Sequence, residues 1–564
     1  MANKDYTNWS REDLVKEVTT LRKRKKYGIV WENKVEQVAE LCKKSLPVLT
    51  EVTEKELKTR DDYPNNILIE GDNYHALAVL NYTHKNDIDV IYIDPPYNTG
   101  NKSWRYNNDY IEKEDSFRHS KWLSFMEKRL KLAKNVLKNS GVMIISIDSY
   151  ELFNLGALCD EIFGEDNRLG VLAVVHKPEG RNQDKFFSTS HEYMLVYAKN
   201  KDKVFFKKAL INNDIKESFN EEDKKGKYKI NNFIRGGGGD HNLRKNKPHF
   251  FYPIYVSRDL KKMALEETKG YYKILPITKA GQERTWKTIK ETFIERLEAE
   301  DIIARRDENG EVQIYEKYRE EKGQLIKTHW VDKRYNAINY GTNLLENILG
   351  RKLFDYPKSL YLVLDILKIT SNKNAIILDF FAGSGTTGHA VLELNKEDGG
   401  SRKFILCTNN ENRICEEVCY PRLKSVIKGY KNLNGNVVDA LDGNLKYFKT
   451  EFVDAKSTDR NKKRLVDKST EMLCLKEDCF EEIKKDENFR IFKNNRGKLL
   501  GVVYDDEGIE PFKREVKKTG KLFITYIFSL DESKREEEFE DVENLVELKP
   551  IPAVILNVYN RIFK

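Results

Sequence analysis

The chain has 564 residues, of which 34% are charged, 39% hydrophobic and 11% aromatic. This composition excludes a disordered chain and gives enough length for several domains with a large core. The net charge of +8 suits a polyanionic partner, although many proteins reach it by chance. The seven cysteines lack paired metal-ligand spacing, and no apolar run reaches the ~18 residues of a membrane span. We expect a cytoplasmic protein with neither a metal site nor a membrane anchor.

The first part of the chain changes character near residue 60. Residues 1–60 are predicted to be helical, and Ser10 and Asp13 have the spacing of a capping box. The basic run at 22–26 is expected to be solvated surface. Beyond it, helices, including one near 119–138, alternate with strands predicted at 66–70, 90–93, 142–147 and 193–197. This alternation predicts an α/β fold with a parallel sheet.

A double-proline sequence ends the second of these strands, in the order Asp94, Pro95, Pro96 and Tyr97. Prolines stop strand pairing, so this loop is expected at the carboxyl end of the strand, where α/β sheets bind ligands. Asp94 and the Pro95 carbonyl are suited to accept both N–H bonds of an exocyclic amino group, such as adenine N6. The ring of Tyr97 offers a stacking face for an extruded base. The alternative is a plain turn in which Asp94 caps a local backbone group.

Residues 201–345 are rich in lysine with interleaved aromatics, and the strand–helix rhythm fades there. We interpret this segment as an inserted recognition domain. Basic side chains flank or follow the glycine run 236–239 and are our DNA-binding candidates: Arg235, Arg244, Lys245 and Lys247. Arginine can read guanine edges, whereas lysine mostly contacts phosphates. For any single residue, a basic surface loop hinged by glycines is an equal alternative.

A glycine-rich loop, Asp379–Gly388, lies between a strand predicted at 375–378 and a helix starting at 389–394. This layout is typical of nucleotide-type sites, and Thr386 and Thr387 are expected to cap the helix. A phosphate-binding loop is disfavoured because His389 stands where lysine is required and Ala390 where serine or threonine is required. An NAD site, with glycines at another spacing, and a purely structural turn remain as alternatives.

The next predicted strand, 403–408, is followed by Asn409–Asn412. A carboxylate at this place commonly binds ribose hydroxyls, so Glu411 is our candidate and Asn410 the fallback. Asn412 is alternatively an ordinary N-cap of a helix over 414–418, and both roles can hold together. Beyond residue 440, the sequence predicts a strand at 499–504 and contains an acidic stretch at 536–541, without a catalytic signature.

The two loops, with the catalytic loop before the cofactor loop, resemble the amino-group DNA methyltransferases that use S-adenosylmethionine, in the permuted (beta) class. The chain is most similar to the modification subunit of a type III restriction–modification system. The resemblance covers most of the chain and extends to 67–73, 94–100, 120–126, 141–148, 190–193 and 408–412. The glycine run at 236–239 departs from it, with more glycines than expected in a recognition region.

This resemblance implies a Rossmann-like methyltransferase domain split by an inserted target-recognition domain, with a small C-terminal domain for dimerisation or partner docking. The implied parts are an N-terminal helical segment 1–60, the catalytic half 61–200, the recognition domain 201–345, the cofactor half 346–440 and the C-terminal domain 441–564. Double-stranded DNA is the implied substrate, with a homodimer and a restriction (helicase/nuclease) subunit as partners. An aspartate heading the catalytic motif favours adenine N6. Alternatives are a cytosine-N4 methyltransferase and a sequence-reading subunit that directs a restriction partner.

The resemblance also implies roles around the cofactor. Asp72 contacts its adenine, Phe381 lines the adenine site, and Gly383 and Gly385 pass the methionine moiety. The segment beginning at Pro357-Lys358-Ser359 closes that end. The full set of predicted cofactor-binding residues is Asp72, Lys358, Asp379, Phe381, Gly383, Ser384, Gly385, Thr386 and Glu411.

Overall fold

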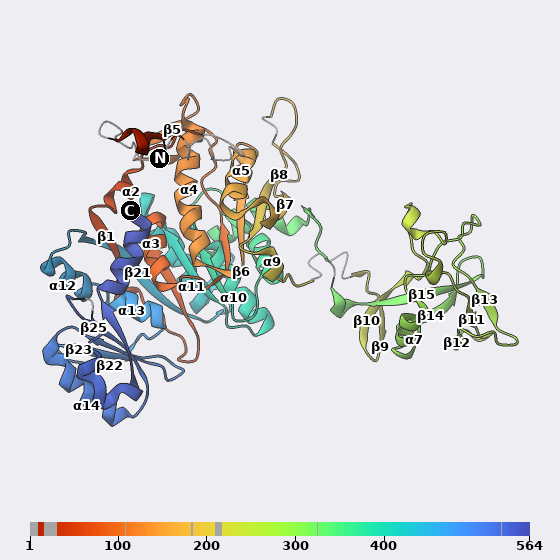
Figure 1. Cartoon of the computed structure of the whole chain (residues 1–564). Coiled ribbons are helices and arrows are strands. Elements are labelled where there is room, and N and C mark those ends of the chain that lie inside the picture. The colour runs from red at the N-terminus through yellow and green to blue at the C-terminus, as the bar shows by residue number, and fades with distance from the viewer. Residues whose placement is uncertain are drawn as a thin grey trace. The chain divides into compact units, whose positions relative to one another are not determined.

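A computed structural model describes residues 9–15, 18, 31–107, 109–181, 184–208, 217–237, 239–323, 325–531 and 533–563. The chain forms two compact units (Figure 1). The first combines Met1–Phe206 with Lys327–Lys564, and the second is Lys207–Ile326. A continuous insertion therefore separates the two halves of the first unit in sequence.

The first unit is built on a ten-stranded sheet in the order β1-β21-β2-β18-β17-β3-β6-β8-β7-β16. The six strands from β21 to β6 are parallel, whereas β1 and β8 pair antiparallel with their inner neighbours. The strands are β1 (Ser45–Glu51), β2 (Asn65–Glu70), β3 (Ile88–Ile93), β6 (Leu137–Ile147), β7 (Arg168–Val175), β8 (His191–Ala198), β16 (His329–Trp330), β17 (Ile376–Asp379), β18 (Lys403–Thr408) and β21 (Asn444–Asp454). The predicted α/β class is confirmed. The six strands predicted from the sequence for this unit's sheet are also present, as β2, β3, β6, β8, β17 and β18, in a sheet that is mostly rather than fully parallel.

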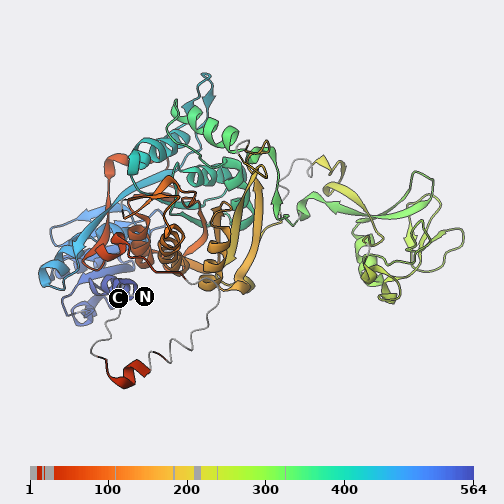
Figure 2. The same cartoon turned by 90° about the horizontal axis from the view of Figure 1, so that it is seen from above.

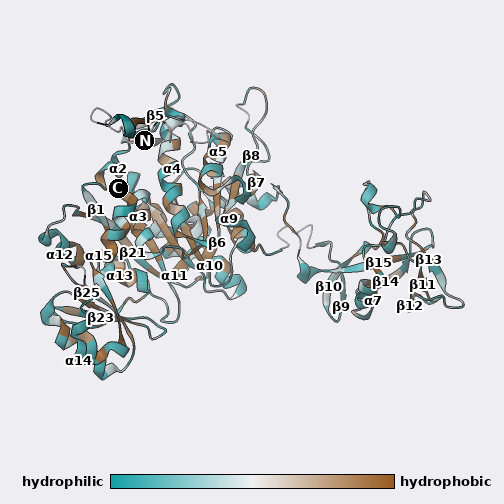
Figure 3. Ribbon diagram, in the orientation of Figure 1, coloured by the Kyte–Doolittle hydropathy of each residue, from teal (hydrophilic) through white to brown (hydrophobic). Residues whose placement is uncertain are grey.

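Helices cover both faces of this sheet (Figure 2). One face carries α3 (Asn73–Thr83), α4 (Arg118–Val136) and α5 (Leu152–Phe163), and the other carries α8 (Asn343–Leu349), α9 (Leu360–Thr370), α10 (Thr386–Asp398) and α11 (Tyr420–Lys428). The predicted helix near 119–138 is α4. Because both faces are covered, the inner strands are continuous apolar runs: Val90, Ile91 and Ile93 are fully buried. Figure 3 shows the hydrophobic colour gathered in these central strands.

The helical prediction for the whole of 1–60 is wrong for residues 45–51, which form strand β1. Val48 and Leu49 are fully buried where β1 pairs with β21, so tertiary packing decides the structure of this segment. Half of the predicted capping box forms: Asp13 N donates to Ser10 Oγ at 3.1 Å, while the Asp13 carboxylate accepts from the Ser10 hydroxyl at 2.7 Å. The basic run at 22–26 lies outside the described residues.

The end of the chain forms a five-stranded sheet in the order β22-β23-β24-β25-β26, with α14 (Ile509–Thr519) packed against it. Its strands are β22 (Glu481–Lys485), β23 (Phe489–Lys493), β24 (Leu499–Val503), β25 (Phe523–Phe528) and β26 (Val546–Ile551). The strand predicted at 499–504 is β24. The acidic stretch lies in a short 3-10 segment, Glu536–Leu545. Helices α13 (Thr470–Glu477) and α15 (Ala553–Phe563) contact α3.

The second unit has its own core and two small antiparallel sheets. The first sheet follows the order β14-β15-β10-β9 and the second β12-β11-β13. The strands are β9 (Glu221–Asp223), β10 (Gly226–Asn232), β11 (Ile254–Val256), β12 (Met263–Ala264), β13 (Tyr272–Ile274), β14 (Ile302–Arg306) and β15 (Val312–Arg319). Phe233, Trp286 and Phe293, the last in α7 (Lys290–Glu298), are fully buried at its centre. In the described part of both units, no helix combines the length and hydrophobicity of a membrane span.

Candidate active site

The predicted site residues of the first unit gather at one edge of the large sheet. Asp72 follows β2, Glu411 follows β18, Asp379 ends β17 and Asp94 follows β3. These four parallel strands are consecutive in the sheet, and neighbouring strands lie about 4.8 Å apart. The catalytic and glycine loops therefore emerge side by side, although Asp94 and Asp379 are far apart in sequence. This edge, the carboxyl end of the strands, is where open α/β sheets bind ligands.

Asp379 ties the glycine loop to the first turn of α10. Its Oδ1 accepts from Phe381 N at 2.9 Å, and its Oδ2 accepts from Thr387 Oγ1 at 2.6 Å. Burial raises the pKa of this carboxyl to about 7. The prediction that Thr386 and Thr387 cap the helix is wrong, because Gly385 is the N-cap and both threonines already lie inside α10. Their hydroxyls are used elsewhere.

Gly383 and Gly385 hold backbone conformations that favour glycine, with φ of +49° and +79°. A Cβ on Gly385 would also approach Cys419 Sγ to 3.1 Å. From the interior, the buried guanidinium of Arg422 donates to Ser384 Oγ at 3.2 Å and to Thr386 Oγ1 at 2.8 Å. The result is a fixed, open-backbone cradle at the start of a helix, which fits the close approach of an adenosyl cofactor.

Asp72 and Phe381 are both connected to this cradle by contacts of their own or of their neighbours. Asp72 is the N-cap of α3, where its side chain accepts from Tyr74 N at 2.7 Å. The neighbouring Asn73 donates to the Phe380 carbonyl at 2.9 Å. The ring of Phe381 packs on Phe125, with 5.8 Å between centroids. A carboxylate and an aromatic wall are thus joined to the glycine loop, as an adenine site requires.

Glu411 is half-buried at the start of a short 3-10 turn, Glu411–Arg413. The alternative in which Asn412 caps the following helix is wrong, because Asn412 has a left-handed backbone (φ +53°) and Arg413 is the N-cap. Asn410 instead accepts from Glu416 N at 3.2 Å. The side chain of Asn410 is therefore committed to the backbone, and its fallback role on ribose is weakened relative to Glu411.

At the catalytic loop, Lys358 contacts two side chains that were predicted, Asp94 and Tyr97, and one that was not, Glu192. Lys358 Nζ lies 3.2 Å from Asp94 Oδ1, 2.6 Å from Glu192 Oε2 and 2.6 Å from Tyr97 Oη. It also lies 4.7 Å from the centroid of the Tyr97 ring. Tyr97 Oη donates to Glu192 at 3.0 Å. Lys358, predicted on the cofactor side, therefore contacts the catalytic residues.

The charges of this cluster are set by burial and by mutual attraction. Burial raises the pKa of Asp94 to about 6, although Lys358 opposes the shift. Burial would raise the pKa of Glu192 and lower that of Lys358, but their attraction outweighs both effects. The pKa of Glu192 is lowered and that of Lys358 is raised. Glu192 and Lys358 form an ion pair, and of the two carboxyls in this cluster Asp94 is the one with the raised pKa.

No role was assigned from the sequence to Glu192, or to the side chains that form hydrogen bonds with the catalytic loop and stabilise it. Asn98 donates to the fully buried Glu151 at 2.5 Å, and His119 Nδ1 lies 2.6 Å from the same carboxylate oxygen. The Trp122 indole donates to the Pro96 carbonyl at 2.8 Å. For Glu192 a signal existed, since it is a charged residue in an otherwise apolar and aromatic strand.

In the second unit, three of the four predicted DNA-binding residues, Arg235, Arg244 and Lys247, lie over the rings of Phe250 or Phe251. The guanidinium of Arg235 donates to the carbonyls of Trp286 at 3.2 Å and Lys287 at 2.8 Å. Arg244 pairs with Glu283 at 2.8 Å, Lys245 with Asp240 at 3.3 Å, and Lys247 lies over Phe250. Arg235 thus stabilises its own loop. Contact of these residues with DNA stays a prediction.

Comparison with known proteins identifies the class. The model of a DNA methylase family, N6/N4 type, matches residues 88–418, more than half of the chain. A second model, the D12 class of N6 adenine-specific DNA methyltransferases, matches residues 12–154. The fold is therefore that of an amino-group methylase. The chain belongs to the N6/N4 DNA methylase family, and it is an S-adenosylmethionine-dependent DNA adenine methyltransferase.

Individual relatives agree with this assignment. The type II methyltransferase M.KpnI of Klebsiella pneumoniae is 36% identical over 403 residues, covering 71% of this chain and 92% of that protein. The type III enzyme EcoPI Mod subunit of Escherichia phage P1 is 34% identical, covering 61% of this chain and 58% of the subunit. The StyLTI Mod subunit of Salmonella typhimurium is 32% identical, covering 68% and 59%. The chain thus matches less than two thirds of the length of these two Mod subunits.

The pKa of Asp94 predicts how methylation depends on pH. The value of kcat/KM for DNA should fall by about tenfold per pH unit below pH 6, because protonation removes an acceptor for the target amino group. Replacing Glu192→Gln removes a negative charge that raises this pKa, so the inflection should move to lower pH. A pH profile of initial rates tests both, and a profile that is flat between pH 5 and 8 would contradict the assignment.

The left-handed glycines predict a second outcome. Gly385→Ala should weaken binding of S-adenosylhomocysteine by about tenfold, because the left-handed backbone costs ~1–2 kcal/mol with a side chain and the new Cβ displaces the loop. Gly399→Ala is the matched control: Gly399 ends α10 with φ +66°, but a Cβ there meets open space. Both variants should lose a similar amount of Tm, and calorimetry should show weaker binding of S-adenosylhomocysteine for Gly385→Ala alone. Equal affinities would refute the cradle.

Proposed function

We propose that Asp94 and the Pro95 carbonyl hold the amino group of a flipped adenine for methyl transfer, with Tyr97 stacking the base. The observation that carries this proposal is the position of Lys358 Nζ. It is an N–H donor held against Asp94 and hydrogen-bonded to the Tyr97 hydroxyl at the edge of the ring. This supports Asp94 as an acceptor for an amino nitrogen, and Lys358 must yield its place when the base enters.

The chemistry follows from these groups. S-adenosylmethionine supplies an electrophilic methyl group when it is bound. Two acceptors on the amino N–H bonds favour a pyramidal nitrogen, whose lone pair forms the new N–C bond as the methyl–sulfur bond breaks. The nitrogen then gives up a proton, and Asp94 is the acceptor because its pKa of about 6 lets it take and release a proton near neutrality. Stacking on Tyr97 contributes about 1–3 kcal/mol toward holding the extruded base.

Around the donor, we propose that Gly383, Gly385 and their neighbours Ser384 and Thr386 carry the methionine end. Asp72, Phe381 and Glu411 would bind the adenosine end, and Asp379 would shape the loop. The adjacency of β3 and β17 supports this, because a cofactor held by the glycine loop would have its methyl group near the catalytic loop. Proximity and alignment would supply most of the rate acceleration.

We further propose that the chain is the modification subunit of a type III restriction–modification system, working as a homodimer with a restriction subunit. The Mod relatives support this role, and the inserted Lys207–Ile326 unit, with its basic loop, would read the DNA sequence. A solitary type II methyltransferase is the second candidate, favoured by the 92% coverage of M.KpnI.

Methylation of unmethylated DNA by the purified chain tests the reaction itself. Digestion to nucleosides and mass spectrometry should give N6-methyladenine, and Asp94→Ala should abolish it while DNA binding is retained. Asp166→Ala, which removes a carboxylate whose side chain is 96% exposed, should leave the rate unchanged. N4-methylcytosine as the product, or full turnover in Asp94→Ala, would overturn the proposal.

The oligomeric state is tested separately by analytical ultracentrifugation of the full chain. A homodimer should sediment with twice the chain mass of 66.1 kDa across the micromolar range. A species of a single chain mass under these conditions would contradict the dimer and favour the type II alternative.

A further inference from the structure

The proposed mechanism does not use Arg129, although it is among the largest fully buried side chains of the described residues. It lies on α4, and a guanidinium in such a place is costly unless its donors are paired. Arg129 Nε donates to Asn73 Oδ1 at 2.5 Å, and Nη1 donates to the Phe125 carbonyl at 2.9 Å. Nη2 lies 2.7 Å from Glu36 Oε1 and 3.4 Å from Asp72 Oδ1. The ion pair with Glu36 is the tightest of its charged contacts.

Three of these contacts lead to the adenine side of the cofactor site. Asp72 is the predicted adenine ligand. Asn73 passes the connection on to the glycine loop by donating to the Phe380 carbonyl. The guanidinium carbon also lies 3.7 Å from the centroid of the Phe125 ring, which packs on Phe381. One buried cation therefore joins the carboxylate, the aromatic wall and the glycine loop.

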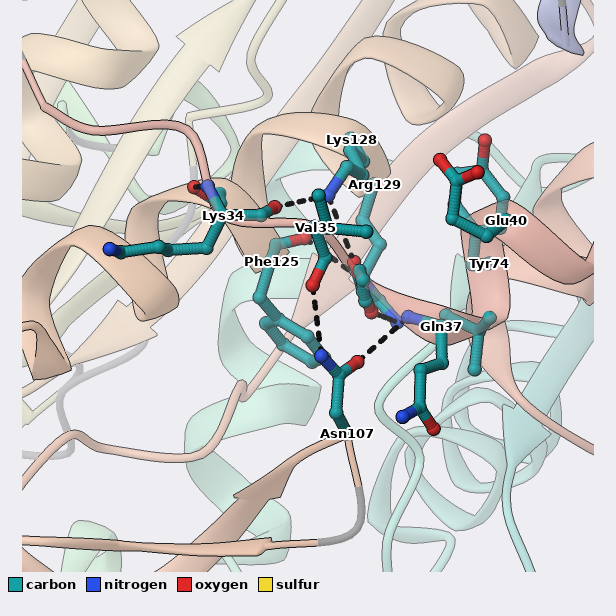
Figure 4. Close-up of polar contacts among 12 residues, drawn as sticks. Lys34, Val35, Gln37, Glu40, Tyr74, Asn107, Phe125, Lys128 and Arg129 are labelled. Carbon is teal, nitrogen blue, oxygen red and sulfur yellow. Dashed lines mark hydrogen bonds and ion pairs between the residues drawn. The ribbon is translucent and has the colours of Figure 1, made fainter. Parts of the chain in front are cut away.

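Glu36, the counter-ion, precedes the 88–418 region that matches the N6/N4 DNA methylase family and lies within the 12–154 region that matches the D12 class. It is only 4% exposed, in an extended segment just before α2 (Gln37–Leu41). Figure 4 shows how this segment is fixed. Lys34 N donates to Ser124 Oγ at 3.0 Å, and Lys128 donates to the Lys34 carbonyl at 3.3 Å, both on α4.

The other side of the segment is held by the turn of the β4–β5 hairpin (Asn101–Tyr106 and Asp109–Glu112). Asn107 Oδ1 accepts from Gln37 N at 2.7 Å, and Asn107 Nδ2 donates to the Val35 carbonyl at 2.9 Å (Figure 4). Residues 34–37, which we name the N-terminal strap, are thus clamped between α4 and this hairpin, and they place Glu36 on Arg129.

We propose that Glu36 and Arg129 are positioning residues for the adenine end of the cofactor, and that the N-terminal strap is part of the cofactor site. This inference rests on the proposed role of Asp72. With Glu36 in place, the Arg129 charge is neutralised and Asp72 keeps its carboxylate available at 3.4 Å. Without the Glu36 charge, Asp72 is the remaining carboxylate partner and is drawn onto Arg129, away from the adenine.

The test uses the full chain and calorimetric binding of S-adenosylhomocysteine. Glu36→Gln keeps the shape of the side chain but removes its charge. Arg129→Lys keeps the charge but replaces the guanidinium, with its several N–H donors, by a single ammonium group. Both should weaken binding by about tenfold. KM for S-adenosylmethionine should rise similarly, with kcat at saturating cofactor within about twofold of wild type.

Arg402→Lys is the matched control. Arg402 is also fully buried in the first unit, and it pairs with Asp398 at the far end of α10 rather than with the cofactor loop. This variant should lose thermal stability without a change in affinity. If both Glu36→Gln and Arg129→Lys bind S-adenosylhomocysteine as tightly as Arg402→Lys does, the inference is overturned.

Hydrogen exchange of the wild-type chain gives a readout that does not depend on the variants folding. The amides of Lys34 and Gln37, which donate to side chains on α4 and the hairpin, should become more protected when S-adenosylhomocysteine binds. Unchanged protection would count against the strap. Failure of the wild type to bind S-adenosylhomocysteine would overturn the proposed function itself, whereas tight binding in all variants overturns only this inference.

Discussion

The pairing of β17 with β3 is the constraint on which the rest of the site depends. Ile377 and Leu378 pair in parallel with Val90 and Ile91, so two loops from distant parts of the sequence leave the sheet at the same edge. The order of the loops along the chain then has no bearing on their relation in space. It also explains how a compact unit of its own can be inserted between the halves, because the sheet closes without it.

The edge of the sheet that these strands create is unusually charged for its burial. Asp94, Glu192 and Lys358 meet at the catalytic loop, Asp379 lies under the glycine loop, and Arg129 lies behind Asp72. Each buried charge is stabilised by an opposite charge or by a hydrogen-bond donor. For Asp94 this stabilisation does not fully offset the cost of burial. Asp94 is the carboxyl of the catalytic cluster whose pKa burial raises, and this agrees with the proton-accepting role proposed for it.

The sequence predicted the strands and loops well, because apolar β-branched runs, double prolines and glycines act over a few residues. It was wrong where tertiary contacts decide: residues 45–51 form a strand through pairing with β21, and Gly385 displaces the threonines from the cap. Arg129 could not be assigned from sequence, since its carboxylate partners come from segments more than 50 residues away. The partners of Glu192 are equally distant, and only its charge within an apolar strand gave a signal. The roles of the cofactor, catalytic and DNA-binding residues stay predictions, although the first unit brings the cofactor and catalytic residues together.

The two units have separate hydrophobic cores with no residue in common, one centred on the large sheet and the other on Phe233, Trp286 and Phe293. A substitution within the second core therefore alters packing in which none of the first core's residues takes part. If the insert reads DNA as proposed, changes in its recognition surface can accumulate over evolutionary time without a matching change in the methyltransferase core, so specificity and catalysis are free to follow separate mutational histories.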